Sequence, residues 1–516
     1  MILLALIAVS LPALFGASLS YLLARKIGRK RCRDLDFVSC GVGITLGYIF
    51  VARLMWQIDQ ANQTVFSWTN LYILFTVTLA LIVWAIWAHF RDRRKNKLLG
   101  LEAPSRRSAD PLLKLTLATL CSISIVQVFL APVSAWDAID WWVASADRFI
   151  AVDTQLLPQF IWDNFNYLTW DPYPYYDWAS QEPVSFDDPF PYEHYHPITI
   201  SLIAAYAAIW SYEFNAINLN MLPWVYCWLS IFIIIRGLMA KFRVNKNVSL
   251  LVAYFAISAP LFENHFTLAG YAEIWMTAVS LGSLSLISIG HRNADYRLLM
   301  AGIGVAFSCI WIKNSGFIFV ITILAATCLL AVNQLKLKHI ALSTFIILSL
   351  LLYVFSYGYD FTLGGTRWAV LYGEDVVIHL AGRSFAIEVA NVLQVARNLL
   401  WAIFINSSYS VLGLAWIMVS IHWAVNARRW RDLGGGYFAS GLVFFYFSSL
   451  LFLFLLVSQL IWPLALQVAT VGSDTANSRY HIPVFITMLT FATLVFFGRS
   501  EPSDTSLQEA TESQGI

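Results

Sequence analysis

Charge is what this sequence of 516 residues has least of, because Asp, Glu, Lys and Arg together make up only 12% of it. A soluble domain is about one quarter charged. Runs of about 20 residues with almost no charge recur along the whole chain, and a helix needs that length to span a bilayer. The scarcity of charge excludes an ordinary soluble protein and predicts an all-α polytopic membrane protein. The net charge of +2 gives no argument for a nucleic-acid partner.

Other absences narrow the choice further. None of the six cysteines falls in a long polar loop, so neither a disulfide framework nor a cysteine-based metal site is expected. No repeat of 20–50 residues is visible. The first apolar run has no basic residue before it and a basic flank after it, so we interpret it as a first membrane span and not as a signal peptide.

Basic clusters punctuate the apolar runs and set the expected topology, since Lys and Arg favour the cytoplasmic side. They lie at 25–33, 91–107, 241–246, 291–297, 336–339 and 428–431. Placing all of them inside predicts about thirteen crossings, with the N-terminus outside and the C-terminus inside. The expected spans are 2–24, 36–56, 69–90, 112–133, 219–236, 248–262, 270–290, 297–312, 316–333, 340–357, 399–424, 437–462 and 482–498.

One apolar segment, 197–212, does not fit this alternation. If it crossed the bilayer, the cluster at 241–246 would lie outside, so we favour a re-entrant or interfacial helix over a true span.

The expected organisation has three parts. Residues 1–111 form an N-terminal module of three spans with a basic cytoplasmic linker, for which the sequence suggests no function. Residues 112–498 form the main transmembrane domain, with external loops at 134–196 and 358–398. The second loop has a helical pattern from Val376 onward. The polar tail 499–516 is expected to be disordered.

The first external loop is acidic and aromatic. It carries eleven Asp or Glu residues but one basic residue, Arg148, and it opens with the sequence AWDAIDWW. Asp137 and Asp140 share a face if this stretch is helical. Each could be a general base or a metal ligand. Taken alone, the pattern fits a solvated interfacial helix anchored by Trp136 and Trp141 better.

Two further ionisable residues are expected at the same outer surface. Glu273, after Tyr271 in GYAE, begins the span 270–290, and Lys313 interrupts a long apolar stretch in the sequence KNSG. An ionisable group in such a place is a functional-site hypothesis by default. The alternative, equally open, is a tight turn from which Lys313 reaches the lipid headgroups.

The end of the chain adds a cation, since Arg479 and Tyr480 in SRYHIP lie at the outer mouth of the last span. Lys and Arg can hold phosphate oxygens, and aromatic planes suit the apolar faces of sugar rings. His194 and His196, in EHYHP, could bind a divalent cation such as Mg²⁺ or Mn²⁺ with nearby carboxylates, but H-x-H is a weak signal and simple polar contacts are favoured. Together these residues suit transfer from a lipid phosphate to a polar acceptor.

The motifs WDAIDWW, HPITISLIAAY, GYAE, KNSG and SRYHIP resemble those of the GT-C membrane glycosyltransferases, and more narrowly the bacterial relatives of the family 39 and protein mannosyltransferase group. The resemblance covers about residues 136–483. It implies a bundle of many helices and an inverting transfer of sugar from a polyprenyl-phosphate carrier, with a catalytic acidic residue in the first long outer loop.

The resemblance also implies roles for single residues. Asp137 matches the acidic residue of the first loop, and Glu273 matches a second acidic position. Lys313 and Asn314 fall where relatives commonly read Lys-Asn-Glu-Gly, but Ser315 replaces that Glu. Many family members also lack the three preceding spans.

We therefore expect a glycosyltransferase of the cell envelope, with its site on the periplasmic face of a bacterial inner membrane and a glycan, lipid or protein acceptor. Asp137 would be the base, with Asp140 and Glu273 as further catalytic candidates. Donor phosphate would be bound by Lys313, Arg479 and Tyr480. Substrate would contact Trp136, Trp141, His194, His196, Tyr271 and Asn314. The alternative is a polytopic transporter or lipid-linked sugar flippase.

Overall fold

The structure is a computed structural model of the chain. It describes residues 1–27, 33–60, 67–98, 109–130, 176–177, 182–183, 199–214, 219, 221–258, 272–313, 315–332, 359–363, 366–372, 376–380, 383–387, 418, 421, 441–455 and 482–497.

Helices make up nearly all of the described chain, and six are long and apolar enough to cross a membrane. These six are α1 (Ile2–Ile27), α2 (Arg33–Gln60), α3 (Trp68–Leu98), α4 (Pro111–Leu130), α8 (Leu222–Lys241) and α11 (Glu273–Arg292). The shorter apolar helices are α7 (Thr199–Glu213), α9 (Lys246–Ser258), α12 (Tyr296–Ile312), α13 (Gly316–Val332), Gly441–Leu455 and α19 (Ile482–Phe497).

The expected predominance of helices is thus confirmed, and six of them are long and apolar enough to cross a membrane. Every predicted span that the structure describes coincides with a helix, whereas 340–357 and most of 399–424 lie outside the described residues. The count of thirteen crossings and the GT-C arrangement stay predictions.

The helical pattern expected from Val376 onward is wrong, and the chain is not purely α. Four strands form an antiparallel sheet in the order β3 (Tyr359–Leu363), β4 (Thr366–Tyr372), β5 (Val376–Leu380) and β6 (Arg383–Ile387). The backbone register pairs Leu363 with Thr366 and Tyr372 with Val376, so the strands follow one another as hairpins. The run Val-Val-Ile at the start of β5 has the β-branched residues that favour strands. A short pair, β1 (Tyr176–Asp177) with β2 (Glu182–Pro183), lies in the first loop.

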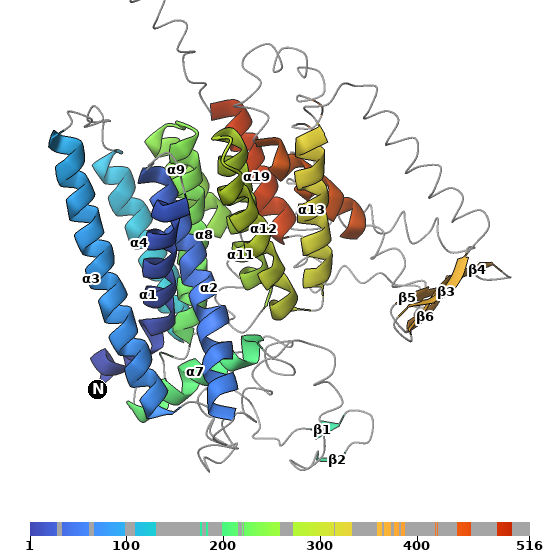
Figure 1. Cartoon of the computed structure of the whole chain (residues 1–516), viewed down its shortest axis with the longest axis horizontal. Helices are drawn as coiled ribbons and strands as arrows, with labels where there is room; N and C mark the ends of the chain where they lie inside the picture. The colour runs from blue at the N-terminus through green and yellow to red at the C-terminus, as the bar shows by residue number, and fades with distance from the viewer. Residues whose placement is uncertain are drawn as a thin grey trace, which may run out of the picture. The chain divides into compact units, whose positions relative to one another are not determined.

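The chain divides into two compact units. The first contains Met1–Ile323, Gly436–Gly441 and Leu489–Ile516, and the second contains Leu324–Gly435 and Leu442–Met488. Helices α1, α2 and α3 belong to the same unit as α8 and α11 (Figure 1), and the expected module boundary near residue 111 stays a prediction.

Helix α2 is the centre of the first unit, and glycines let its neighbours approach closely. Its Gly43 and Gly47 form a GxxxG pair against α1, where a Cβ on Gly47 would lie 2.0 Å from the Pro12 carbonyl oxygen. On the α8 side, a Cβ on Gly41 would lie 2.9 Å from the Ser230 carbonyl oxygen. In lipid there is no hydrophobic driving force between helices, so their association depends on close van der Waals packing. Small residues at the contacts allow that packing.

Helix α1 contains Pro12, which removes the hydrogen bond that would reach the carbonyl of Ala8. The hydroxyl of Tyr206 on α7 donates to that carbonyl oxygen at 2.8 Å, and Tyr48 of α2 donates to the neighbouring Val9 oxygen at 2.8 Å. A freed carbonyl in a membrane helix needs such a donor, because lipid cannot supply one. Pro12 therefore marks the point at which α7 and α2 attach to α1.

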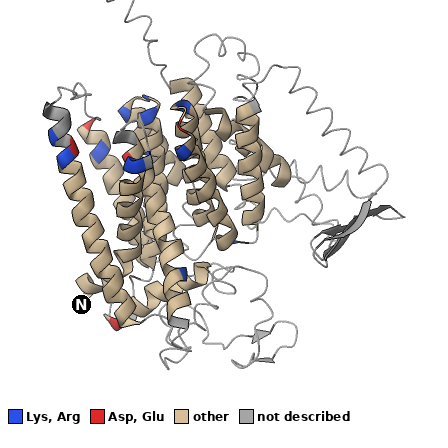
Figure 2. Cartoon of the chain, in the orientation of Figure 1, with Lys and Arg blue, Asp and Glu red and all other residues tan. Residues whose placement is uncertain are grey.

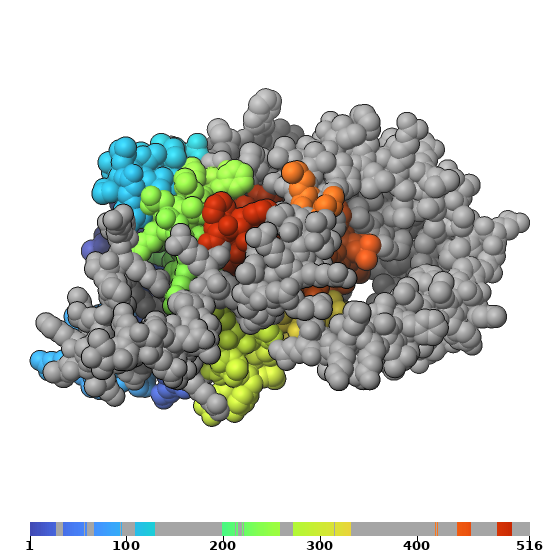
Figure 3. Space-filling model, turned by 90° about the horizontal axis from the view of Figure 1, so that it is seen from above, coloured from blue at the N-terminus to red at the C-terminus, as the bar shows by residue number. Residues whose placement is uncertain are grey.

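The Lys and Arg residues of the first unit gather toward one end of its helices, which we name the basic end (Figure 2). At this end α1, α3, α8 and α11 finish and α2, α4, α9 and α12 begin (Figure 1). Figure 3 looks onto this end and shows α4 beside α8 and α9. There the backbone N–H of Asp110 donates to Asn247 Oδ1 at 3.0 Å. The alternation predicted from the basic clusters agrees with this arrangement.

Helix α7 lies across the helix ends opposite the basic end, and not alongside the other helices (Figure 1). It has 15 residues, about 22 Å of helix, which is short for a span. Its Trp210 side chain is buried and meets the Trp68 ring at the start of α3 edge-on, with ring centroids 4.9 Å apart. Helix α7 is thus among the shorter apolar helices, and the expectation that the segment 197–212 does not cross stays a prediction.

Candidate functional site

The structure brings together Glu273 and Lys313, two of the residues singled out from the sequence. Lys313 Nζ donates to Glu273 Oε1 at 2.7 Å, across 40 residues of sequence. Both side chains are buried, at 4% exposure for Glu273 and 7% for Lys313. They form a desolvated ion pair inside the first unit.

Helix ends place the two charges. Glu273 is the first residue of α11, where its negative charge meets the positive end of the helix dipole. Lys313 is the C-terminal cap of α12, where the dipole is negative, and its backbone is extended with φ −152° and ψ 152°. The local fields therefore favour each charge at its position, in addition to their mutual attraction.

A tight turn between α12 and α13 holds Lys313 in this place. The backbone N–H of Gly316 donates to the Lys313 carbonyl oxygen at 2.8 Å. A Cβ on Gly316 would lie 1.9 Å from the Cys309 carbonyl oxygen, so the last residue of KNSG must be glycine. The turn expected from KNSG is present, but Lys313 points inward to Glu273 and does not reach toward headgroups.

The pair lies at the ends of α11 and α12 that are opposite the basic end. Taking two charges out of water costs several kcal/mol per ion, and their attraction repays this only in part. An apolar pair would fill the space at less cost. A buried ion pair inside a membrane bundle therefore indicates a role beyond stability.

Buried aromatic residues support the α11 side of the site. Trp275, two residues after Glu273, meets the Tyr48 ring edge-on with ring centroids 5.8 Å apart, and the Trp224 ring of α8 at 6.0 Å. All three side chains are less than 2% exposed. Their rings fix the first turn of α11 against α2 and α8, and so fix the backbone that carries Glu273.

The other predicted site residues lie outside the described residues, so their positions stay predictions. They are Trp136, Asp137, Asp140, Trp141, His194, His196, Tyr271, Asn314, Arg479 and Tyr480. Within the described ranges, no group of three or more His, Cys, Asp or Glu side chains is arranged to hold a metal ion.

Sequence reasoning missed Arg53, a second cation at this end of the helices. It lies 20 residues after the start of α2, and its guanidinium carbon is 5.3 Å from the centroid of the Trp311 ring on α12. The signal was present in the sequence, because Arg53 interrupts the apolar run of the second span.

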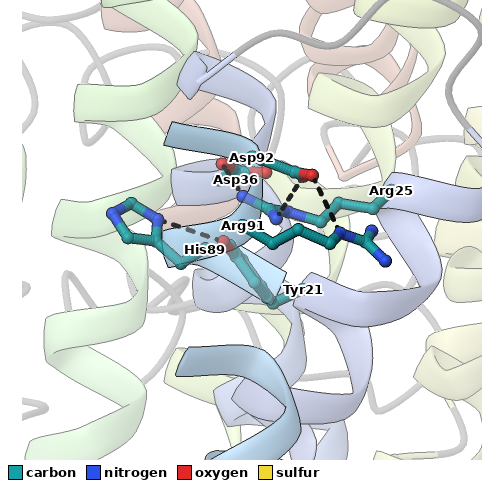
Figure 4. A network of polar contacts seen from close by, with 6 residues as sticks. All are labelled: Tyr21, Arg25, Asp36, His89, Arg91 and Asp92. Carbon is teal, nitrogen blue, oxygen red and sulfur yellow. Dashed lines mark hydrogen bonds and ion pairs between the residues drawn. The ribbon is translucent and has the colours of Figure 1, made fainter. Parts of the chain in front are cut away.

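A polar network at the basic end was also missed (Figure 4). Arg25 Nη1 of α1 donates to Asp92 Oδ2 of α3 at 2.7 Å, and Arg25 Nη2 lies 3.5 Å from Asp36 Oδ2 of α2. Arg91 Nε lies 3.5 Å from Asp92 Oδ1, and the Tyr21 hydroxyl is 3.2 Å from His89 Nδ1. Each described charge here has an opposite partner from the first three helices. The network ties α1, α2 and α3 together.

Comparison of the chain with known protein families, with characterised proteins and with solved structures found no match. The features that bear on function are therefore the motifs and the geometry of the Glu273–Lys313 pair.

Proposed function

We propose that the chain is an integral-membrane glycosyltransferase that moves a sugar from a polyprenyl-phosphate carrier to a glycan, lipid or protein acceptor, with inversion, at the external face of the membrane. One observation carries the proposal. The acidic residue of GYAE and the lysine of KNSG, two positions that match the GT-C motifs, form a buried contact of 2.7 Å at the helix ends opposite the basic clusters.

The proposed chemistry divides the reaction among few groups. Asp137 accepts the proton of the acceptor hydroxyl, while Lys313 and Arg479 bind the phosphate of the donor. The sugar carbon then exchanges its bond to the phosphate oxygen for a bond to the acceptor oxygen, and the polyprenyl phosphate leaves. Trp136 and Trp141 seat the sugar.

Within this scheme Glu273 is a positioning residue. Its carboxylate holds the Lys313 ammonium in one place and neutralises it while no donor is bound. A donor phosphate that arrives beside Lys313 meets an ammonium already aligned, so little side-chain ordering remains for the binding step.

The transporter alternative has less support. Helix α11 carries a row of buried hydroxyls, which could suggest a polar path through the bundle. However, Thr277 donates to the Glu273 carbonyl oxygen at 2.8 Å and Ser283 to the Gly302 carbonyl oxygen at 2.7 Å. The Thr277 bond lies within α11 and the Ser283 bond joins α11 to α12, so both hydroxyls are satisfied by backbone oxygens.

The test uses the full-length protein in nanodiscs with a panel of polyprenyl-phosphate sugars and a cell-envelope extract as the source of acceptor. Release of free polyprenyl phosphate is the measurement. We expect turnover with one sugar, and a loss of at least a hundredfold in Lys313→Met. The control is Lys114→Met, which changes an exposed lysine of α4 and should leave turnover unchanged.

Two results would contradict the proposal. One is the absence of turnover with every donor while the protein, in proteoliposomes, moves a lipid-linked sugar between leaflets. The other is normal turnover in a folded Lys313→Met variant.

A further inference from the structure

Arg53 is a cation inside a membrane-spanning segment without an acidic partner in the described part of the chain. It belongs to the apolar window Leu35–Met55 of α2. An arginine in such a segment is costly unless it pairs, faces a polar cavity or reaches the headgroups. Arg53 lies near the end of α2 that is opposite the basic end, so it does not belong to the basic clusters.

Aromatic rings contact only one side of the Arg53 guanidinium. The Trp311 ring lies under it at 5.3 Å, and the Phe50 ring meets Trp311 edge-on with centroids 5.1 Å apart at 85°. The Nε atom of Arg53 is buried and has no hydrogen-bond partner among the described groups. A cation–π contact compensates part of the charge, but it does not use the N–H donors.

The surface around Arg53 is apolar and open. Trp311 is 38% exposed, Phe50 44% and Leu54 56%. On α12 the exposed side chains Met300, Phe307 and Trp311 follow one another at spacings of seven and four residues, which is one face of a helix. Side chains of this kind contact lipid chains, so Arg53 is reached from the bilayer.

Arg53 and Lys313, which lies two residues after Trp311, differ in their ion pairing. The ammonium of Lys313 is neutralised by Glu273, whereas Arg53 has no ion pair in the described structure. Of these two cations, Arg53 is therefore the one whose charge is not already shared with a carboxylate in the described structure.

We infer that Arg53, with Trp311 and Phe50, binds the phosphate of an isoprenoid lipid that enters sideways from the bilayer. The guanidinium presents paired N–H donors that match two phosphate oxygens, and the exposed face of α12 lies along the lipid chain. The inference rests on the proposed function for the isoprenoid nature of the lipid. It gives α2, one of the first three helices, a role in holding the carrier.

The test measures binding without sugar or acceptor. Geranylgeranyl phosphate is titrated into the full-length protein in detergent, and the bound fraction is read by native mass spectrometry. Geranylgeraniol, inorganic phosphate and phosphatidylglycerol are the comparison ligands. We expect saturable binding of geranylgeranyl phosphate and at least tenfold weaker binding of the other three.

Variants locate the site. Arg53→Gln should weaken binding roughly tenfold to a hundredfold, since it removes a charge-assisted contact. Arg53→Lys keeps the charge but loses the paired donors, so it should weaken binding severalfold. It is the variant to measure if Arg53→Gln does not fold. The matched control is Arg297→Gln, because Arg297 lies over the Tyr296 ring at 5.9 Å at the other end of α12. The control should bind normally.

Unchanged binding in Arg53→Lys or in a folded Arg53→Gln variant would overturn the inference. Equal binding of geranylgeraniol or phosphatidylglycerol would overturn it too, since neither the phosphate nor the isoprenoid chain would then be selected. Failure of the proposed function gives a different result, namely Arg53-dependent binding with no sugar transfer from any donor. Transfer that continues without any effect of Arg53 overturns only this inference.

Discussion

Glu273 and Lys313 show what a single pair of residues can and cannot indicate from sequence. Each interrupts an apolar stretch, and this identified both as candidates. Their contact across 40 residues follows from the packing of α11 against α12, which periodicity does not predict. From the sequence, Lys313 could belong to a functional site or reach the lipid headgroups from a tight turn. The structure shows that its side chain points inward to Glu273.

The pair should behave as a unit in stability. Removing one partner leaves a buried charge without its counterion, which costs about 3–5 kcal/mol. We therefore expect Glu273→Gln and Lys313→Met each to lower the thermal unfolding midpoint in detergent strongly, and the double variant to recover much of that loss. Transfer activity should stay absent in the double variant, since the phosphate contact is still missing.

The control for this cycle is Lys114→Met, which changes an exposed side chain and should shift the midpoint little. Additive losses in the double variant would contradict a coupled pair. Recovery of both stability and activity would show that the pair is structural only.

Asp137 and Asp140 carry a prediction that rests on sequence and resemblance alone. A base acts only within hydrogen-bond reach of the acceptor hydroxyl, so only one of two carboxylates three residues apart is expected to serve. Asp137→Asn should lower turnover by a factor on the order of 100 to 10,000 with the protein level unchanged. Asp140→Asn should retain much more activity. Near-normal turnover in Asp137→Asn would transfer the role to Asp140 or Glu273.

At the scale of elements, the glycines of α2 make the most direct test of packing. A Cβ on Gly47 would lie 2.0 Å from a backbone oxygen of Pro12, an atom that cannot move aside alone. Gly47→Ala should therefore force α1 from α2 and destabilise the protein by about 1–3 kcal/mol. The measurement is the thermal unfolding midpoint in detergent.

Gly304 of α12 supplies the matched control, because nothing lies within 4 Å of the Cβ that Gly304→Ala would add. Alanine there should be neutral or stabilise the helix by about 0.5–1 kcal/mol. Equal effects at the two positions would refute the close contact of α1 and α2.

Prediction of the elements succeeded where local pattern decides and failed where pairing decides. Apolar length alone placed α1 to α4, and the structure agrees to within a few residues for α1, α2 and α4, whereas α3 continues eight residues beyond its predicted end. The segment from Val376 was expected to be helical, yet β5 forms because it pairs with β4 and β6. A short apolar run fits a strand or a helix equally well, and only its partners distinguish the two.

For the whole molecule, the sequence could predict which side of the bundle each helix end occupies, but not which helices touch. In the first unit the described Lys and Arg residues gather at the basic end, as their preference for one side of the membrane predicts. Which helices contact one another depends on the shapes of their side chains. The sequence thus did not predict that α2 packs against α8 and α11 in one unit. Arg53 could be singled out because it interrupts an apolar run, but its contact with Trp311, far away in the sequence, could not be predicted.

The last prediction concerns the orientation of the whole molecule, and the two ends of α3 test it. Thr69 and Arg94 are both exposed, and 25 residues of helix separate them by about 38 Å, which exceeds the hydrocarbon core. In a variant with all six native cysteines replaced, a maleimide that cannot cross membranes should label Thr69→Cys on intact cells and Arg94→Cys only after permeabilisation. Leu112→Cys, exposed at the start of α4, should follow Arg94→Cys, because both lie at the basic end. Tyr173→Cys in the acidic loop should follow Thr69→Cys. The reverse pattern would place the Glu273–Lys313 pair on the cytoplasmic side, where the donor would then have to be bound. Labelling of Thr69→Cys and Arg94→Cys from one side would instead remove α3 from the set of spanning helices.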